Sequence, residues 1–332
     1  MLELPRRVSR HPGLRAPAWR ALCVAAWLAA CLHPSAARAW GPEGNRIVAL
    51  IATRQLAPEA QAKIQALLAG DERPDLAAAS TWADDILARR PETEAWHFVS
   101  IPDAEAAYRA DRDCPGNACA VAQVARWRAV LADAQAPPGR RAEALKFLVS
   151  LVADVHQPLH VDCRPLPPRR RYPRPAFACG ADPHGDRGGD GLMVRFGDLG
   201  VSLHHVWDHE LFYGETGTLA AVADRLAAEV TPAQRREWAS GTVEDWVNQT
   251  HALARLVAYG MLPKGQPLQR RGIVISLRYE AEARNAVELQ MKRAGVRLAA
   301  LLNDALAGAA TVQGSGFSAQ GEPQPRASRP AP

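Results

Sequence analysis

Helical periodicity constrains this chain more than any other feature of its sequence. In most long segments apolar residues recur every three or four positions, which is typical of amphipathic helices packed on a core. Residues 191–196 (GLMVRF) predict one arm of a small β-hairpin. The expected fold class is all-α, a single mainly helical domain, because neither repeats nor a clear break divide the 332 residues. The periodic segments are 47–56, 58–70, 121–134, 142–155, 219–230, 232–241, 244–260 and 276–308.

The N-terminal segment is a candidate signal peptide. Five arginines precede an apolar run at 21–32, and Ala37-Arg38-Ala39 forms a small-x-small cleavage site before Trp40. The run is too short to span a bilayer, and the pattern is that of a secretory signal peptide. We therefore expect a signal at 1–39, a domain at 40–308 in a secreted or periplasmic protein, and a disordered tail at 309–332, rich in Gly, Ser, Gln and Pro.

Two other export patterns overlap this signal. Leu28-Ala29-Ala30-Cys31 resembles a lipoprotein box that would anchor the chain at Cys31, and Arg6-Arg7 resembles a twin-arginine signal. Removing residues 1–39 takes away six arginines and one glutamate, so 40 basic and 35 acidic residues become 34 and 34. Global charge therefore gives no case for nucleic-acid binding. We expect a monomer without a stable membrane span.

Cysteine use agrees with export. Outside the signal, an even number of cysteines in an oxidising compartment predicts disulfides, and short local loops give the pairs Cys114–Cys119 and Cys163–Cys179. A Cys-rich zinc site is the alternative, although the spacing lacks a CxxC pair. Between the second pair, Arg169, Arg170 and Arg171 belong either to a solvated, Pro-stiffened loop or to a phosphate-binding rim.

Polar residues interrupt one of the predicted helices. In KFLVSLVADVHQPLHVD (146–162), Asp154 follows an apolar face, and His160 comes six residues later. A buried aspartate is costly unless it is paired or bound to a metal. In SLHHVWDHE, His204 and Asp208 stand four residues apart on one face of a predicted helix, which is favourable spacing for zinc.

Asp84 and His97 are flanked by Trp and apolar residues. Taken singly, each fits a hydrogen-bonded core residue at least as well as a ligand. Together with Asp154, His160 and the pair above, they form a set of nitrogen and oxygen ligands without thiolates. Such a set points to zinc with one position open for water. Zinc lowers the pKa of that water to about 7 and polarises a phosphoryl oxygen.

Several motifs in fixed order resemble one family, the three-zinc, single-strand-specific nucleases and 3′-nucleotidases. The resemblance covers nearly the whole chain after residue 39. It implies an all-α fold related to the zinc-dependent phospholipase C and nuclease fold, and substrates that are single-stranded DNA or RNA and nucleoside 3′-monophosphates. The motifs are WGPEGNRIVALIA (40–52), WADDI (82–86), WHFVSI (96–101), KFLVSLVADVHQPLHV (146–161), GDRGGD (185–190), LHHVWD (203–208) and AGVRLAALLN (294–303).

The resemblance also implies a ligand set for three zinc ions, Zn²⁺ being the cofactor. One ion would be held by Asp84, His97, the position of Ser150, and Asp154. A second would be held by His160, His204 and Asp208. The third would use the α-amino nitrogen and carbonyl oxygen of Trp40, the position of Asn45, and Asp154 as a bridge. Signal cleavage before Trp40 would thus expose a ligand.

The chain departs from the family at three positions. The family usually has histidine where this chain has Asn45 and Ser150, and arginine where it has Leu87. A hydroxyl or amide oxygen is a poorer zinc ligand than imidazole, so one site is intact and two are weakened. His156, His205 or His209 would be needed to compensate, although His156 lies two residues from Asp154 and points away on a helix. Arg89 or Arg90 would have to replace the missing arginine.

Three functional hypotheses follow. The first is a zinc-dependent phosphodiesterase in which water held near Asp84, the predicted catalytic residue, attacks phosphorus. The second is a degenerate homologue that binds nucleic acid or nucleotide with an incomplete zinc cluster. The third is a zinc phospholipase C-like hydrolase of another phosphoester. Six of eight side-chain ligands are retained, which favours the enzyme.

Overall fold

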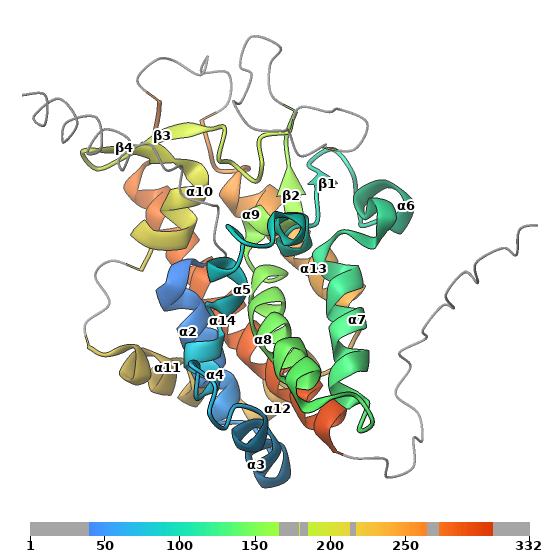
Figure 1. Cartoon of the computed structure of the whole chain (residues 1–332). Helices are drawn as coiled ribbons and strands as arrows, with labels where there is room; N and C mark the ends of the chain where they lie inside the picture. The colour runs from blue at the N-terminus through green and yellow to red at the C-terminus, as the bar shows by residue number, and fades with distance from the viewer. Residues whose placement is uncertain (1–39, 166–178, 180–184, 213–216, 264–271, 308–332) are drawn as a thin grey trace, which may run out of the picture. The chain divides into compact units, whose positions relative to one another are not determined.

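The computed structural model describes residues 40–165, 179, 185–212, 217–263 and 272–307. Within these ranges the chain is mainly helical (Figure 1), so the predicted fold class is confirmed. The longer helices are α2 (Gly41–Thr53), α3 (Pro58–Leu67), α7 (Ala120–Ala132), α8 (Pro138–Asp154), α11 (Leu219–Ala228), α13 (Val243–Leu253) and α14 (Leu277–Leu306). The shorter ones are α4 (Leu76–Ala79), α5 (Trp82–Asp85), η1 (Pro91–His97), α6 (Ala110–Asp113), η2 (Pro115–Asn117), α9 (Pro158–Val161), α10 (Leu203–His205), η3 (Val206–Glu210), α12 (Pro232–Trp238) and η4 (Ala254–Ala258).

Helix α8 is enclosed by other helices. Every residue from Ala144 to Asp154 is buried, as expected for a helix that is apolar nearly all round. It packs against α7, α5, α14 and α2 (Figure 1), so its C-terminal end lies inside the protein. Asp154 is therefore presented at the end of a buried helix.

The end of α8 agrees with the predicted segment 142–155 to within one residue. The helix stops at Asp154, before Pro158, and Pro158 instead occupies the first turn of α9. Proline suits that position because the first backbone N–H groups of a helix have no partner within it. A turn between the two helices therefore separates Asp154, at the end of α8, from His160 in α9.

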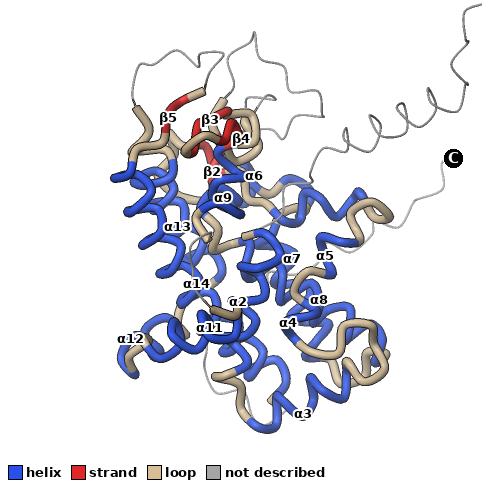
Figure 2. The backbone as a smooth tube through the Cα atoms, turned by 90° about the vertical axis from the view of Figure 1, so that its left-hand side faces the viewer, coloured by secondary structure: helices blue, strands red, loops and turns tan. Residues whose placement is uncertain are grey.

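Strands form two small sheets, grouped at one end of the helices (Figure 2). In the first, β1 (Ile101–Pro102) pairs in parallel with β2 (Asp162–Cys163). In the second, β3 (Met193–Phe196) forms an antiparallel hairpin with β4 (Leu199–Ser202) and a parallel pair with β5 (Ile273–Val274). The predicted hairpin arm is confirmed. Pairing of β1 with β2 brings the segment after His97 beside α9, where the Val99 N–H donates to the carbonyl of His160 at 2.7 Å.

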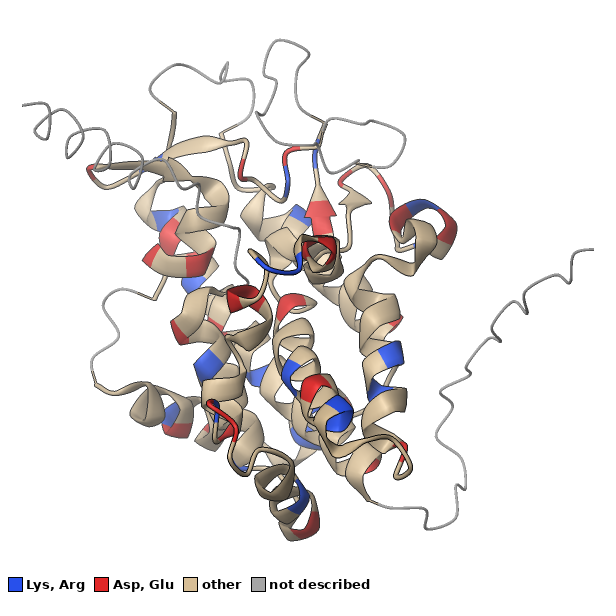
Figure 3. Ribbon diagram, viewed as in Figure 1, with Lys and Arg blue, Asp and Glu red and all other residues tan. Residues whose placement is uncertain are grey.

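Disulfides join Cys114 to Cys119 and Cys163 to Cys179, as predicted. Basic and acidic residues share the same helices, for example α8 (Figure 3), which agrees with the near-zero net charge expected for residues 40–332. No helix in the described part of the chain is both long and apolar enough to cross a membrane.

Candidate metal centre

Three of the predicted ligands meet in one group, which we call the triad: His160, His204 and Asp208. One ligand atom from each lies within 4.8 Å of the others, and all three side chains are buried. Nε2 of His160 lies 3.2 Å from Nε2 of His204, and Oδ2 of Asp208 lies 3.2 Å from the same His204 atom. Two nitrogen ligands about 2.1 Å from a tetrahedral zinc are roughly 3.4 Å apart, so these spacings fit one ion.

Backbone carbonyls fix the orientation of both triad imidazoles. Nδ1 of His160 lies 2.7 Å from the carbonyl oxygen of His97, and Nδ1 of His204 lies 2.9 Å from that of Gly188. Because a carbonyl oxygen only accepts, each Nδ1 carries the hydrogen. In a neutral ring Nε2 then bears a lone pair. Two lone pairs and a carboxylate therefore converge, an arrangement that requires a proton or a cation between them.

Without metal, a proton meets this need. Burial lowers the pKa of His204, but the carboxylate of Asp208 more than offsets burial and raises that pKa to about 9. Burial, together with the neighbouring His204, holds the pKa of His160 well below 6.5. A zinc ion at the triad would replace the proton on His204.

A second group, which we call the Asp154 cluster, contains Asp84, His97 and Asp154 with Asn45 and Ser150. Nδ1 of His97 lies 2.8 Å from Oδ2 of Asp154 and 3.9 Å from Oδ1 of Asp84. The amide of Asn45 donates to Oδ2 of Asp84 at 3.4 Å. Burial opposes protonation of His97, but Asp154 raises its pKa to about 9; burial raises the pKa of Asp154 itself to about 6.

Several buried polar atoms of the Asp154 cluster lack a hydrogen-bond partner among the described residues: Oδ1 of Asn45, Nε2 of His97, Oγ of Ser150 and Oδ1 of Asp154. Ser150 and Asp154 are fully buried and stand one helical turn apart on α8. Buried polar atoms are normally paired, and each unpaired one costs about 1–3 kcal/mol. A cation bound among these atoms would satisfy them together, so the residues fit a metal although two are weak ligands.

Trp40 lies against this cluster. Its side chain is fully buried, and its indole N–H donates at 3.0 Å to the carbonyl of Ala153, the residue before Asp154. Nδ1 of His160 lies 3.8 Å from Oδ1 of Asp154. The triad and the Asp154 cluster are therefore adjacent, with Asp154 on their common side.

Three of the residues considered as replacements, His156, His205 and Arg90, have other partners. His156 is fully buried rather than on the surface, and its ring lies between the carbonyl of Val152 and the guanidinium of Arg297. Nε2 of His205 lies 3.1 Å from Oε1 of Glu210. Arg90 forms ion pairs with Glu143 and Glu92. Arg169, Arg170 and Arg171 lie outside the described residues.

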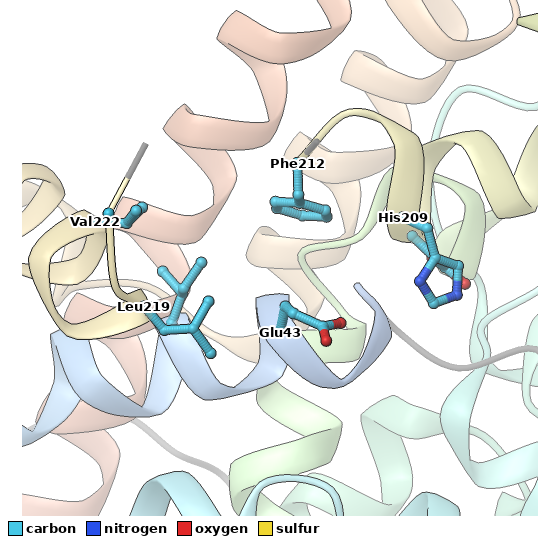
Figure 4. A pocket seen from close by; sticks show the side chains of 8 residues that line it. Glu43, His209, Phe212, Leu219 and Val222 are labelled. Carbon is cyan, nitrogen blue, oxygen red and sulfur yellow. The ribbon is translucent and has the colours of Figure 1, made fainter. Parts of the chain in front are cut away.

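His209 lines a hollow of about 160 Å³ (Figure 4), and Asp208 of the triad lines it too. Glu43 and His209 form its polar end, whereas Phe212, Leu219 and Val222 are apolar. Gly41 approaches the His209 ring so closely that a Cβ added there would lie 2.9 Å from a ring carbon. This packing places His209 beside α2.

Two residues at the triad had no assigned role from sequence. The side-chain amide of Gln157 donates to Oδ1 of Asp208 at 2.8 Å, and Gly188 of GDRGGD accepts from His204. Both hold ligands rather than supply them. The spacing of polar residues in sequence does not reveal such contacts, since they depend on which loop folds back onto which helix.

Two adjacent groups of buried histidines and aspartates on a helical fold are typical of a metal-binding protein. The chain belongs to the S1/P1 nuclease family, whose model matches residues 40–307. The predicted family and the predicted class of enzyme, a hydrolase acting on phosphoester bonds, are thereby confirmed.

Relatives from fungi and plants are named nucleases or endonucleases, in agreement with this family. Over 290 residues the chain is 26% identical to Nuclease P1 of Penicillium citrinum, covering 80% of this chain and 97% of that protein. Nuclease PA3 of a Penicillium species gives the same values. Endonuclease 4 of Arabidopsis thaliana is 28% identical over 295 residues, covering 80% of this chain and 88% of that protein.

Proposed function

We propose that this protein is a zinc-dependent phosphodiesterase that hydrolyses single-stranded DNA and RNA and nucleoside 3′-monophosphates. One observation carries the proposal: two imidazole lone pairs and a carboxylate converge at the triad, at spacings that suit zinc. His160, His204 and Asp208 would hold one ion. A second ion would be held by Asp84, His97 and Asp154, with Ser150 as a weak ligand. A third ion would be held by Trp40, Asn45 and Asp154.

Zinc supplies a Lewis acid that lowers the pKa of water to about 7 and withdraws charge from phosphoryl oxygens. Asp84 orients the attacking water and accepts its proton, and the amide of Asn45, 3.4 Å away, holds that carboxylate in place. The water oxygen forms a bond to phosphorus while the bond to the 3′ oxygen breaks, so no covalent enzyme intermediate is needed. The departing 3′ oxygen would be stabilised by the ion at the triad and takes up a proton from solvent. Arg169, Arg170 and Arg171 would hold the adjacent phosphate.

Export belongs to the same proposal. Cleavage of a signal at residues 1–39 would leave Trp40 with a free α-amine next to Asp154, and two disulfides support folding in an oxidising compartment. The mature chain, beginning at Trp40, is therefore the form to assay.

The experiment combines metal analysis with hydrolysis. The mature protein is dialysed at several zinc concentrations, zinc per chain is measured, and cleavage of single-stranded DNA is compared with that of the Asn45→His, Ser150→His double variant. We expect at least the triad ion to bind tightly, cleavage that grows with zinc, and a more active double variant at low zinc.

One outcome would favour a binding protein instead. Poor ligands at Asn45 and Ser150 are the observation behind that second candidate. The enzyme proposal is wrong if the natural chain binds about one zinc ion and binds single-stranded DNA, but does not cleave that DNA at any zinc concentration. Activity gained by the double variant alone would then locate the loss at those two positions.

A further inference from the structure

The loop Gly185–Asp190 is pressed against both histidines of the triad. Its Gly188 has φ +61°, and a Cβ added there would lie 1.8 Å from the carbonyl oxygen of Leu159, which precedes His160, and 3.4 Å from Nδ1 of His204. No side chain fits in that space without moving backbone. Gly188 therefore lies directly between the peptide that carries one ligand and the imidazole of the other.

Three contacts hold this loop in place. The buried carboxylate of Asp186 accepts from the backbone N–H of Arg164 at 3.0 Å and from the hydroxyl of Tyr259 at 2.8 Å. The guanidinium of Arg187 donates at 2.7 Å to Glu94, on the same short helix as His97. The loop is thus attached to the residues that directly follow β2 and η4, and to η1.

We propose that Gly188 is a positioning residue for metal binding: its carbonyl fixes the tautomer and ring orientation of His204, and Asp186 and Tyr259 keep that carbonyl in place. This inference rests on the proposed zinc site at the triad. A carbonyl at 2.9 Å from Nδ1 selects the tautomer with Nε2 free to bind. Without it, the ring would populate the other tautomer and other orientations.

The test compares two glycines with nearly the same backbone. Gly188 and Gly116 have φ +61° and +63°, but nothing lies within 4 Å of a Cβ built on Gly116. Gly188→Ala and Gly116→Ala therefore carry similar backbone strain, and only the first disturbs the triad. Zinc affinity is measured by competition with a chromophoric chelator. The ring nitrogen through which His204 binds zinc is identified from ¹⁵N chemical shifts of its ring in zinc-loaded protein.

We expect Gly188→Ala to weaken zinc binding about tenfold to hundredfold, the usual effect of losing a group that orients a metal ligand. In the zinc-loaded variant, part of the His204 population should bind zinc through Nδ1 instead of Nε2. Gly116→Ala should match the natural chain in both measurements. If Gly188→Ala does not fold, Tyr259→Phe tests the same proposal more gently, with an expected loss of about twofold to tenfold for one hydrogen bond.

Failure of the two proposals can be told apart. A natural chain that binds no zinc at the triad would remove the proposed site itself. A natural chain that binds zinc, with Gly188→Ala equal to it in affinity and in the zinc-binding nitrogen of His204, would overturn only the positioning role. Equal losses in both alanine variants would also overturn it, because backbone strain alone would then be the cause.

Discussion

The triad and the Asp154 cluster are neighbours, yet they differ in how completely their polar atoms are satisfied. In the triad each imidazole donates to a backbone carbonyl, and Asp208 accepts from Gln157. In the Asp154 cluster, atoms of Asn45 and Ser150 are buried without partners among the described residues. On the proposed ligand assignment, a site organised before metal binds lies beside one that would depend on metal for its stability. Ligand substitutions fall only in the second.

The largest effect should come from breaking the organised site. Asp208→Asn removes the negative charge that draws a cation to the two imidazoles. Cleavage of single-stranded DNA should fall about 1,000-fold or more, since the lost metal stabilisation amounts to several kcal/mol. Asp304→Asn, which alters the ion pair between Asp304 on α14 and Arg128 on α7, is the matched control and should leave cleavage unchanged. Full activity in Asp208→Asn would exclude a catalytic ion at the triad.

The second-largest effect should come from blocking the α-amine of Trp40, which tests whether the Asp154 cluster binds metal independently of the triad. One alanine added before Trp40 in the mature chain replaces the predicted α-amine ligand by an amide. The indole contact to Ala153 can persist, so only metal binding should suffer. We expect about one zinc ion fewer per chain and cleavage reduced roughly tenfold to hundredfold, with zinc affinity at the triad unchanged.

A residue added after Pro332 is the control for the extension. Unchanged zinc content in the N-terminally extended chain would show that the Trp40 amine is not a ligand. A loss at the triad as well would show that the two groups are not independent.

Features that depend on residues close together in the sequence could be predicted, whereas contacts between distant segments could not. Apolar periodicity predicts α8 and α14, because the buried positions of a helix recur every three or four residues within its own segment. Asp84, His97, Asp154 and the triad residues could be named because the family motifs carry them. The two-residue strands β1 and β2 give no sequence signal, because their pairing depends on elements far apart in the chain. Gly188 was within a recognised motif, but its contact with His204 requires the folded loop.

A smaller effect should come from restoring an imidazole to the Asp154 cluster. Ser150 is fully buried on α8, so Ser150→His places a larger side chain in packed surroundings. Without metal we expect the free energy of unfolding to fall by about 1–3 kcal/mol. Zinc should reverse this loss, because a ligand that binds only the folded state stabilises it. Thermal unfolding with zinc and with a chelator measures both quantities.

Ser80→His is the matched control for this substitution. Ser80 is equally buried, but its hydroxyl donates to the carbonyl of Ala77 in α4. The variant should be destabilised with and without zinc alike. Zinc rescue of both variants would mean that stabilisation is general rather than local to the Asp154 cluster.

The smallest effect concerns the hydroxyl of Ser150 itself. Ser150→Ala removes a buried oxygen that has no hydrogen-bond partner among the described residues, and alanine also favours a helix interior. The metal-free chain should therefore gain about 1 kcal/mol, whereas Ser80→Ala should lose about 1 kcal/mol with its hydrogen bond. In a mature chain of 293 residues (40–332) each change is about 1.5–2 °C in Tm, in opposite directions. With zinc bound, the gain in Ser150→Ala should shrink if the hydroxyl is a ligand; an unchanged gain would show that Ser150 contributes nothing to metal binding.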